Sequence, residues 1–369
     1  MHVVPVQTKC SSYPIYVGTE LPAAKDVKTA LAEHVEGESC LVVTDSHVGP
    51  LYGQKICDLL CHIGAARVAH TTFPAGEPSK TLATVERLYR AALEKGLDRQ
   101  SLFIALGGGV VGDVAGFAAA TYMRGIRFLQ IPSTLLAMVD SSVGGKTGVD
   151  LPEGKNLVGA FHQPTFVMAD VSMLKTLPIR ELRCGLAEVV KYGVIMDAEF
   201  FAFLQQHVTL LCKPDLAFYE EVVTRCCKLK ARVVREDERE CTGYRAILNY
   251  GHTFGHALEV LSGYGQLTHG EAVAVGMGMA ADLAVQQGLA DPSLVEQQDK
   301  LLAKVGLPTE FMLSSITSAD IFETMRHDKK VSGGRLRLVL PTAIGSVELR
   351  SDIDPDAVQH TIGGRCGKS

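Results

Sequence analysis

The sequence predicts an α/β domain with a mainly parallel sheet, followed by a mostly helical domain. In the first half, near-continuous apolar runs alternate with helical stretches, which is typical of parallel strands covered on both faces. From about residue 178 onward, apolar residues recur at spacings of three and four, which indicates helices. Pro178 interrupts the pattern between the two parts. We therefore expect domains at residues 1–177 and 178–369.

The individual elements follow from the same patterns. The apolar runs predict strands at Cys40–Thr44, Ser101–Leu106 and Ile126–Ile131. The spacing of apolar residues in the second half predicts helices at Glu181–Met196, Leu216–Glu236, Thr253–Leu261, Glu271–Gln287 and Ser293–Val305.

Composition excludes several classes of protein. The chain has 369 residues, 47% of them hydrophobic, which is enough for two domain cores. A net charge of -5 without blocks of like charge argues against nucleic-acid binding. No apolar stretch approaches the about 18 residues of a membrane span, and the N-terminal residues lack the pattern of a signal peptide. Ten cysteines without a C-x-x-C pair are typical of reduced thiols, so we expect a cytoplasmic protein with no membrane partner.

A glycine-rich segment, Gly107 to Asp113, follows the predicted strand that ends at Leu106. It fits G-x-G-x-x-G at the start of a helix, where backbone N–H groups and the helix dipole suit a pyrophosphate. Asp45, directly after another predicted strand, is a carboxylate suited to a ribose diol. The alternative is that the glycines serve only a tight turn between strand and helix. We interpret the segment as part of a Rossmann-like nucleotide site.

A loop rich in glycine and lysine is expected from Gly144 to Asn156. Its Gly145-Lys146-Thr147 is similar to the end of a P-loop, but G-x-x-x-x-G-K-[ST] requires glycine where Asp140 stands, so the NTPase reading is excluded. Lys155 and Asn156 follow a predicted turn and could present their side chains to a phosphate. Other groups to consider for anion binding are Lys146, Arg124, Lys230, Arg245 and Lys329.

One glutamate and three histidines predict a metal site. His252 and His256 are four residues apart and share one helix face, while His269 precedes a predicted helix and Glu188 lies in another. Two imidazoles and one carboxylate are a common catalytic zinc set that leaves positions open for substrate oxygens. The alternative is that the histidines cap helices or form buried hydrogen bonds, and that Glu188 and Lys191 are a solvated pair.

These motifs resemble those of the 3-dehydroquinate synthase family, and the resemblance covers nearly the whole chain. It rests on the segments Gly107–Asp113, Asp140–Gly148, Gly154–Asn156, Leu186–Gly193 and Asn249–His256. It implies a homodimer with an N-terminal Rossmann-like NAD-binding domain and a mostly helical C-terminal metal-binding domain, with the site in the cleft between them.

The resemblance also implies residue roles. Glu188, His252 and His269 match the family's ligands of zinc, or cobalt in its place. His256 matches a catalytic histidine, and Arg124 an arginine supplied across the dimer interface. The remaining substrate-binding positions match Lys146, Lys155, Asn156, Lys191, Lys230, Arg245, Asn249 and Lys329. The NAD contacts match Asp45, Glu77, Lys80, Gly109, Asp113, Ser133, Thr134, Asp140, Lys146, Lys155, Thr176 and Leu177.

The implied substrate is 3-deoxy-D-arabino-heptulosonate 7-phosphate, a sugar acid phosphate. The implied chemistry is transient oxidation by NAD, elimination of phosphate, re-reduction and intramolecular aldol closure to 3-dehydroquinate. One rival is another sugar phosphate cyclase, whose substrate lacks the carboxylate that Lys230, Arg245 and Lys329 suit. A second rival is a metal-dependent polyol dehydrogenase, which needs no phosphate loop. A third is a binding protein that retains the fold without catalysis.

Overall fold

The structure is a computed structural model that describes residues 1–369 except 10, 214, 264–265, 312–315, 327–335 and 367–369. The chain forms two compact units. Unit 1 contains residues 1–177 and 216–239, and unit 2 contains residues 178–215 and 240–369. Among the described residues, no helix combines the length and the apolar composition that a membrane crossing requires.

Unit 1 is built around a seven-stranded sheet. Its strands are β1 (His2–Gln7), β2 (Ser12–Gly18), β3 (Ser39–Asp45), β4 (Arg67–Phe73), β5 (Leu102–Gly107), β6 (Arg127–Pro132) and β9 (Phe166–Asp170). The strand order is β1-β2-β9-β6-β5-β3-β4, and only the β1–β2 pair is antiparallel. The helices of this unit are α1 (Lys25–Val35), α2 (Gln54–His62), α3 (Leu82–Glu94), α4 (Gly109–Thr121) and α8 (Leu216–Glu236).

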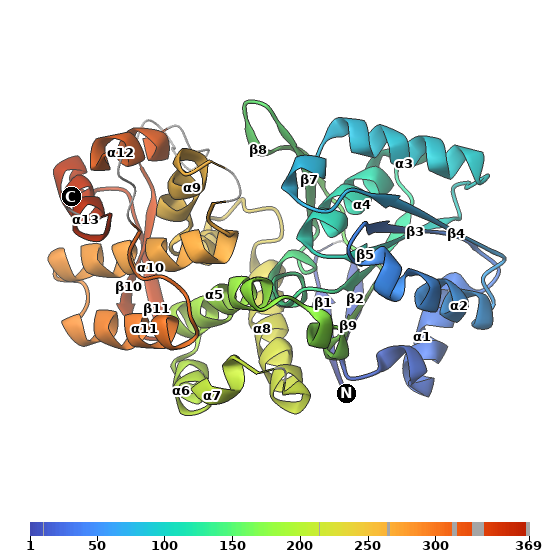
Figure 1. Cartoon of the computed structure of the whole chain (residues 1–369), viewed down its shortest axis with the longest axis horizontal. Coiled ribbons are helices and arrows are strands. Elements are labelled where there is room, and N and C mark those ends of the chain that lie inside the picture. Colours follow the sequence, from blue (N-terminus) through green and yellow to red (C-terminus); the bar gives the residue numbers. More distant parts are fainter. Residues whose placement is uncertain (10, 214, 264–265, 312–315, 327–335, 367–369) are drawn as a thin grey trace. The chain divides into compact units, whose positions relative to one another are not determined.

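Both faces of the sheet are buried, as the apolar runs predict. Leu41 and Val43 of β3 and Phe103 of β5 belong to a buried cluster with side chains of α3 and α4. Because side chains alternate along a strand, Val42 and Ile104 point to the opposite face, where they are also buried. Figure 1 shows α3 and α4 on one side of the sheet and α1 and α2 on the other. The prediction of a parallel α/β sheet is confirmed.

The predicted glycine- and lysine-rich loop is instead an antiparallel hairpin, β7 (Lys146–Leu151) and β8 (Gly154–Phe161). Its two strands lie so close together that a Cβ at Gly159 would overlap the backbone of Thr147. Thr147 and Val149 are buried, and β7 packs on α4. Residues 144–145, before β7, and the turn at residues 152–153 are the parts of the expected loop that lie outside the two strands.

Unit 2 is mostly helical. It contains α5 (Ile179–Met196), α6 (Ala198–Gln206), α7 (Val208–Leu211), α9 (His252–Leu261), α10 (His269–Gln286), α11 (Pro292–Lys304), α12 (Ser318–Arg326) and α13 (Pro355–Arg365). The five helices predicted from apolar spacing correspond to α5, α8, α9, α10 and α11. A hairpin that was not predicted, β10 (Leu338–Ala343) and β11 (Ser346–Arg350), packs on α5 and α10.

The units differ from the expected domains in one segment. The limit between Leu177 and Pro178 coincides with the expected boundary, but residues 216–239, which include α8, belong to unit 1. Helix α8 packs along β1 and β2. The apolar spacing correctly predicts that α8 is a helix. It does not predict that α8 packs on β1 and β2, because apolar periodicity indicates that one face of a helix is buried but does not identify the element that covers it.

Candidate functional site

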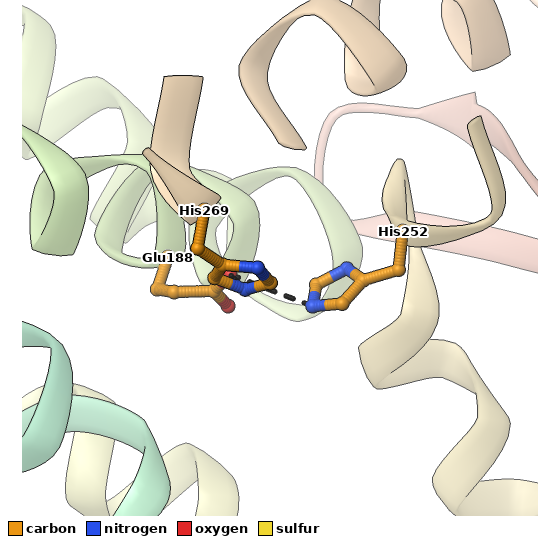
Figure 2. Close-up of side chains that lie close together, drawn as sticks. All are labelled: Glu188, His252 and His269. Carbon is orange, nitrogen blue, oxygen red and sulfur yellow. Dashed lines mark ion pairs between the residues drawn. The ribbon is translucent and has the colours of Figure 1, made fainter. Parts of the chain in front are cut away.

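Three potential metal ligands converge in unit 2 from three different helices. Oε1 of Glu188, on α5, lies 3.6 Å from Nε2 of His252 and 3.5 Å from Nε2 of His269. His252 begins α9 and His269 begins α10. Figure 2 shows the Glu188 carboxylate beside the His269 ring, with the His252 ring directed toward both. Residues far apart in the sequence thus place one carboxylate and two imidazoles around a single point.

Two glycines allow the helices to approach closely enough for this arrangement. At Gly270 a Cβ would overlap the backbone of Cys184, so the start of α10 can lie directly against α5. At Gly276 a Cβ would overlap the carbonyl oxygen of Gly251, so α10 can lie directly against the start of α9. Glycine is required at both positions because the neighbouring backbone occupies the space of a side chain. The close packing brings His252 and His269 to a ring separation of 5.3 Å.

Each imidazole has a second contact on the side away from Glu188. Nδ1 of His252 lies 3.0 Å from the carbonyl oxygen of Tyr250, and Nδ1 of His269 lies 3.5 Å from Oε2 of Glu259. Burial alone would lower the pKa of His269, but hydrogen bonds to Glu188 and Glu259 outweigh it and raise that pKa to about 10. The surroundings of His269 therefore favour a positive charge at this point.

The donor set fits a divalent metal ion. The candidate ligand atoms of Glu188, His252 and His269 all lie within 4.8 Å of one another. An acceptor at Nδ1 of each histidine leaves Nε2 as the nitrogen that can coordinate, which is the usual arrangement around metal-bound histidines. The Glu188 carboxylate is fully buried, so it requires positive charge nearby. Two histidines and one carboxylate leave coordination positions for substrate oxygens.

Two further predicted residues belong to the same cluster. Lys191, one turn after Glu188 on α5, forms an ion pair with it, and both side chains are buried. The expected alternative of a solvated pair is therefore wrong. The His256 ring lies 5.6 Å from that of His252 and 6.1 Å from that of His269. These two residues place a cation and an ionisable imidazole beside the donor set.

In unit 1, the predicted nucleotide residues gather at the carboxyl ends of the strands. Asp45 ends β3 and Gly107 ends β5, and these strands are neighbours in the sheet. From β3 the chain passes to β4 on one side, and later strands extend the sheet on the other side of β5. Such a switch point is where open α/β sheets bind their ligands. The backbone N–H of Ser133 donates to the carbonyl of Gly107 at 2.9 Å, which places Ser133 and Thr134 at the same edge.

The Asp45 carboxylate already has backbone partners. Its Oδ1 accepts hydrogen bonds from the N–H groups of His47 and Val48 at 2.8 and 2.9 Å. Gly109 begins α4, so the helix N-terminus follows directly on the glycine turn. The geometry therefore places a carboxylate and a helix N-terminus at adjacent strand ends, as a dinucleotide site requires.

A buried lysine links three predicted residues. Nζ of Lys80 lies 2.5 Å from Oδ2 of Asp113 and 2.5 Å from Oδ1 of Asn156. Asn156 has a positive φ of 54°, and its N–H donates to Oδ1 of Asp150 at 2.7 Å. Lys155 lies 3.5 Å from Glu77. The β7–β8 hairpin is thereby held against the rest of unit 1 at the residues expected to bind phosphate and NAD.

The other predicted residues occupy varied surroundings. Nζ of Lys230 donates to the backbone oxygen and to Oδ1 of Asp140 at 2.7 and 2.8 Å. Arg245 is buried in unit 2, and Nδ2 of Asn249 donates to Glu240 at 3.4 Å. Arg124 and Lys146 are exposed, and the Thr176 hydroxyl hydrogen-bonds the Tyr52 hydroxyl. Leu177 is the last residue of the first segment of unit 1, and Lys329 lies outside the described residues.

Sequence reasoning missed one residue of this site. Glu259 was given no role, yet its carboxylate is buried and lies 3.5 Å from His269. The signal was present, because Glu259 follows His256 by three residues and His252 by seven, the spacing of one helix face.

Comparison with known families identifies the chain. Residues 70–184 match the family described as 3-dehydroquinate synthase N-terminal, and residues 185–331 match 3-dehydroquinate synthase C-terminal. The 3-dehydroquinate synthase of Desulforamulus reducens is 51% identical over 353 residues, which cover 96% of this chain and 97% of the relative. The chain belongs to the 3-dehydroquinate synthase family. The family's enzyme from Rhodopirellula baltica is 46% identical, with 95% and 94% of the two chains covered.

Solved structures of related enzymes share the fold. A 2-deoxy-scyllo-inosose synthase, complexed with carbaglucose-6-phosphate, NAD+ and Co2+, has a TM-score of 0.88 at 28% identity, covering 98% of this chain and 99% of that one. A 2-epi-5-epi-valiolone synthase from Streptomyces hygroscopicus, with NAD+ and Zn2+ bound, has a TM-score of 0.87 at 27% identity and covers 98% of both chains. An iron-containing alcohol dehydrogenase from Thermococcus thioreducens, at 16% identity and a TM-score of 0.67, shares the fold alone.

Proposed function

We propose that the protein is a 3-dehydroquinate synthase that requires NAD and a divalent metal. It converts 3-deoxy-D-arabino-heptulosonate 7-phosphate to 3-dehydroquinate and inorganic phosphate, and is therefore a carbon–oxygen lyase of aromatic amino acid biosynthesis. The observation that carries this proposal is the buried set of Glu188, His252 and His269, in a chain that matches the family in both units. Full-length relatives at 51% and 46% identity are 3-dehydroquinate synthases, whereas the matched inosose and valiolone synthases are 28% and 27% identical.

When bound, NAD supplies a reversible hydride acceptor and the metal supplies Lewis acidity toward substrate oxygens. Glu188, His252 and His269 hold the metal, with open positions for substrate. Asp45 accepts hydrogen bonds from a ribose, and the N–H groups at Gly109 face the pyrophosphate. Ser133 and Thr134 lie at the same edge of the sheet, and Asp113 lies one turn into α4. The remaining proposed NAD contacts are Glu77, Lys80, Asp140, Lys146, Lys155, Thr176 and Leu177.

Cationic side chains bind and orient the substrate. Lys155 and Asn156, held in place through Glu77 and Lys80, bind the phosphate. Arg245 pairs with the carboxylate, because a buried guanidinium favours a bidentate anion. The supporting positions are Lys146, Lys230, Asn249 and Lys329. Fixing both ends of a flexible sugar acid restricts it to a reactive conformer.

His256 and Lys191, which lie beside the donor set, transfer protons and balance charge in the proposed reaction. His256 is near the ligand histidines without being one of the three donors, so its imidazole positions the phosphate and can exchange a proton with it. Lys191 neutralises part of the charge of Glu188 and presents an ammonium to a substrate hydroxyl. Both roles require the groups to remain close to the metal ligands.

The donor set and the Arg124 segment bear on the identity of the metal and on the oligomeric state. We infer zinc as the metal, with cobalt able to replace it, because two imidazoles and a carboxylate suit both ions. The enzyme is a cytoplasmic homodimer in which Arg124 enters the partner's site. In support, the Arg124 side chain is exposed and its backbone has a positive φ of 69° beside Gly125, so it lies on a sharply turned surface segment.

The decisive experiment follows phosphate and NADH together in one reaction. Purified protein is given the heptulosonate phosphate, zinc and NAD in an amount far below that of the substrate. We expect phosphate to be released over many turnovers without accumulation of NADH, because the hydride returns to the carbon it left. One NADH formed per turnover would identify a net polyol dehydrogenase instead.

Substrate specificity separates this enzyme from the related cyclases. Sedoheptulose 7-phosphate lacks the carboxylate that Arg245 is proposed to bind. We expect it to be cyclised far less efficiently than the heptulosonate phosphate when the two compete. Equal or better use of the carboxylate-free sugar would reject the assignment while leaving the fold and the donor set unaffected.

A further inference from the structure

We propose that Glu259 is a positioning residue of the metal centre, which orients His269 and strengthens it as a ligand. This inference rests on the proposed function, because it requires that Glu188, His252 and His269 bind a metal. Glu259 does not coordinate the metal itself in this proposal. It acts through the imidazole of His269, from the side opposite to the metal.

The geometry places His269 between two carboxylates. Its Nε2 lies 3.5 Å from Oε1 of Glu188, and its Nδ1 lies 3.5 Å from Oε2 of Glu259. A single imidazole cannot turn its ring without losing one of these contacts. Glu259 therefore determines both the ring orientation and which nitrogen carries the proton, leaving Nε2 available for the metal.

Helix α9 supplies both the second ligand and the positioning residue. His252, His256 and Glu259 share one face of α9, and this face is turned toward the start of α10, where His269 is the first residue. The close approach at Gly276 holds these two helices together. Because both side chains are anchored on packed helices and not on loops, the distance between Glu259 and His269 is maintained by the core of unit 2.

The two ligand histidines differ in the charge of their outer partners. His252 faces the neutral carbonyl of Tyr250, at 3.0 Å, whereas His269 faces a full carboxylate. The Glu259 side chain is only 7% exposed, so its charge is weakly screened by water. A carboxylate that accepts the Nδ1 proton increases the electron density at Nε2 and so raises the basicity of the ligand. The charge of Glu259, more than its size, should set the affinity for metal.

A second metal ion is the competing explanation. The donor atoms of His256, Glu259 and His269 also lie within 4.8 Å of one another. That arrangement would make Glu259 a direct ligand and would give two ions per chain. The positioning role predicts one ion, and the two explanations are separated by stoichiometry.

The test measures binding of Zn2+ to the purified full chain, by competition with a chromophoric chelator, for wild type, Glu259→Gln and Glu259→Asp. We expect one ion per wild-type chain. In Glu259→Gln the dissociation constant for zinc should be about 10- to 100-fold larger, because removing the hydrogen-bond partner of a metal-bound histidine typically weakens metal binding by this factor. Glu259→Asp, which keeps the charge, should retain tighter binding than Glu259→Gln. Asp299→Asn is the matched control, because this carboxylate of unit 2 pairs with Arg365 and not with a ligand.

The control should lose thermal stability while keeping the wild-type dissociation constant. The absorption spectrum of Co2+-loaded protein gives a second readout, because its ligand-field bands shift when a coordinating imidazole changes basicity. Equal zinc affinity and equal cobalt spectra in wild type and Glu259→Gln would overturn the proposal, as would two ions per wild-type chain. Failure of wild-type protein to bind any metal would instead reject the proposed function.

Discussion

Nζ of Lys80 lies 2.5 Å from Oδ2 of Asp113, an ion pair in which the lysine side chain is only 6% exposed. The same ammonium reaches Oδ1 of Asn156 on β8. Burial alone would lower the pKa of Lys80, but the carboxylates of Asp113 and Glu77 outweigh it and raise that pKa above its usual value. Lys80 therefore remains charged at all working pH values and holds the β7–β8 hairpin to α4.

Replacing Lys80 with methionine should destabilise the protein by about 2 kcal/mol, because it removes the cation from the Asp113 carboxylate, whose side chain is only 19% exposed. The measurement is the free energy of unfolding in urea. Lys155→Met is the matched control, since its contact with Glu77 is 3.5 Å long and both side chains are partly exposed, so its loss should cost below about 1 kcal/mol. Equal stability of the two variants would contradict the bridging role of Lys80.

Replacing His252 with alanine should reduce bound metal to a trace and abolish activity, because one of three proposed protein ligands is lost. Elemental analysis of the purified variant provides the measurement. His360→Ala is the control, since this histidine lies exposed on α13, outside the donor cluster. Stoichiometric and tightly held metal in His252→Ala would remove that residue from the site.

Replacing Asp45 with alanine should raise the NAD concentration required for half-maximal activity by about 10- to 100-fold, because the ribose of NAD loses a hydrogen bond to a charged group. The product should not change, because the contact is remote from the reacting carbon. Asp45→Asn separates two effects: it retains an acceptor for the N–H groups of His47 and Val48 but loses the charge. A normal NAD requirement in both variants would place the ribose elsewhere.

Mixing two inactive variants tests the proposed contribution of Arg124 across a dimer interface. Arg124→Ala and His252→Ala should each be inactive alone. If the arginine enters the partner's site, co-refolded mixtures should recover about a quarter of wild-type activity, because half of randomly paired dimers contain one intact site. No recovery from mixtures that are shown to form dimers would mean that Arg124 acts within its own chain.

Much of the fold could be predicted because its signals are local. The near-continuous apolar runs of β3, β5 and β6 and the regular spacing in α5, α9 and α10 each indicate burial over most of an element. The candidate donor set was also predictable, since Glu188, His252 and His269 are ligand-type residues in apolar helical settings. The sequence did not contain their mutual distances, which depend on packing.

The elements that were missed lack such local signals. The β7–β8 hairpin contains Gly148 and Gly159, which fit its narrow separation but are depleted in strands, so it was predicted as a loop. Glu259 was missed for a different reason. A glutamate on a helix is usually solvated, and only the packing of α9 against α10 shows that this one is buried beside an imidazole.

The membership of α8 in unit 1 affects the order in which the chain can fold during synthesis. Strands β1 and β2 are made first, yet the helix that packs along them ends at Glu236, after α5, α6 and α7 have been made. At a ribosomal rate of about 5–20 residues per second, the surface of β1 and β2 that α8 covers remains without this helix for on the order of ten seconds or more after these strands have been synthesised. A fragment ending at Leu177 would expose this surface permanently, so the N-terminal unit cannot be produced by simple truncation and needs residues 216–239 joined to it.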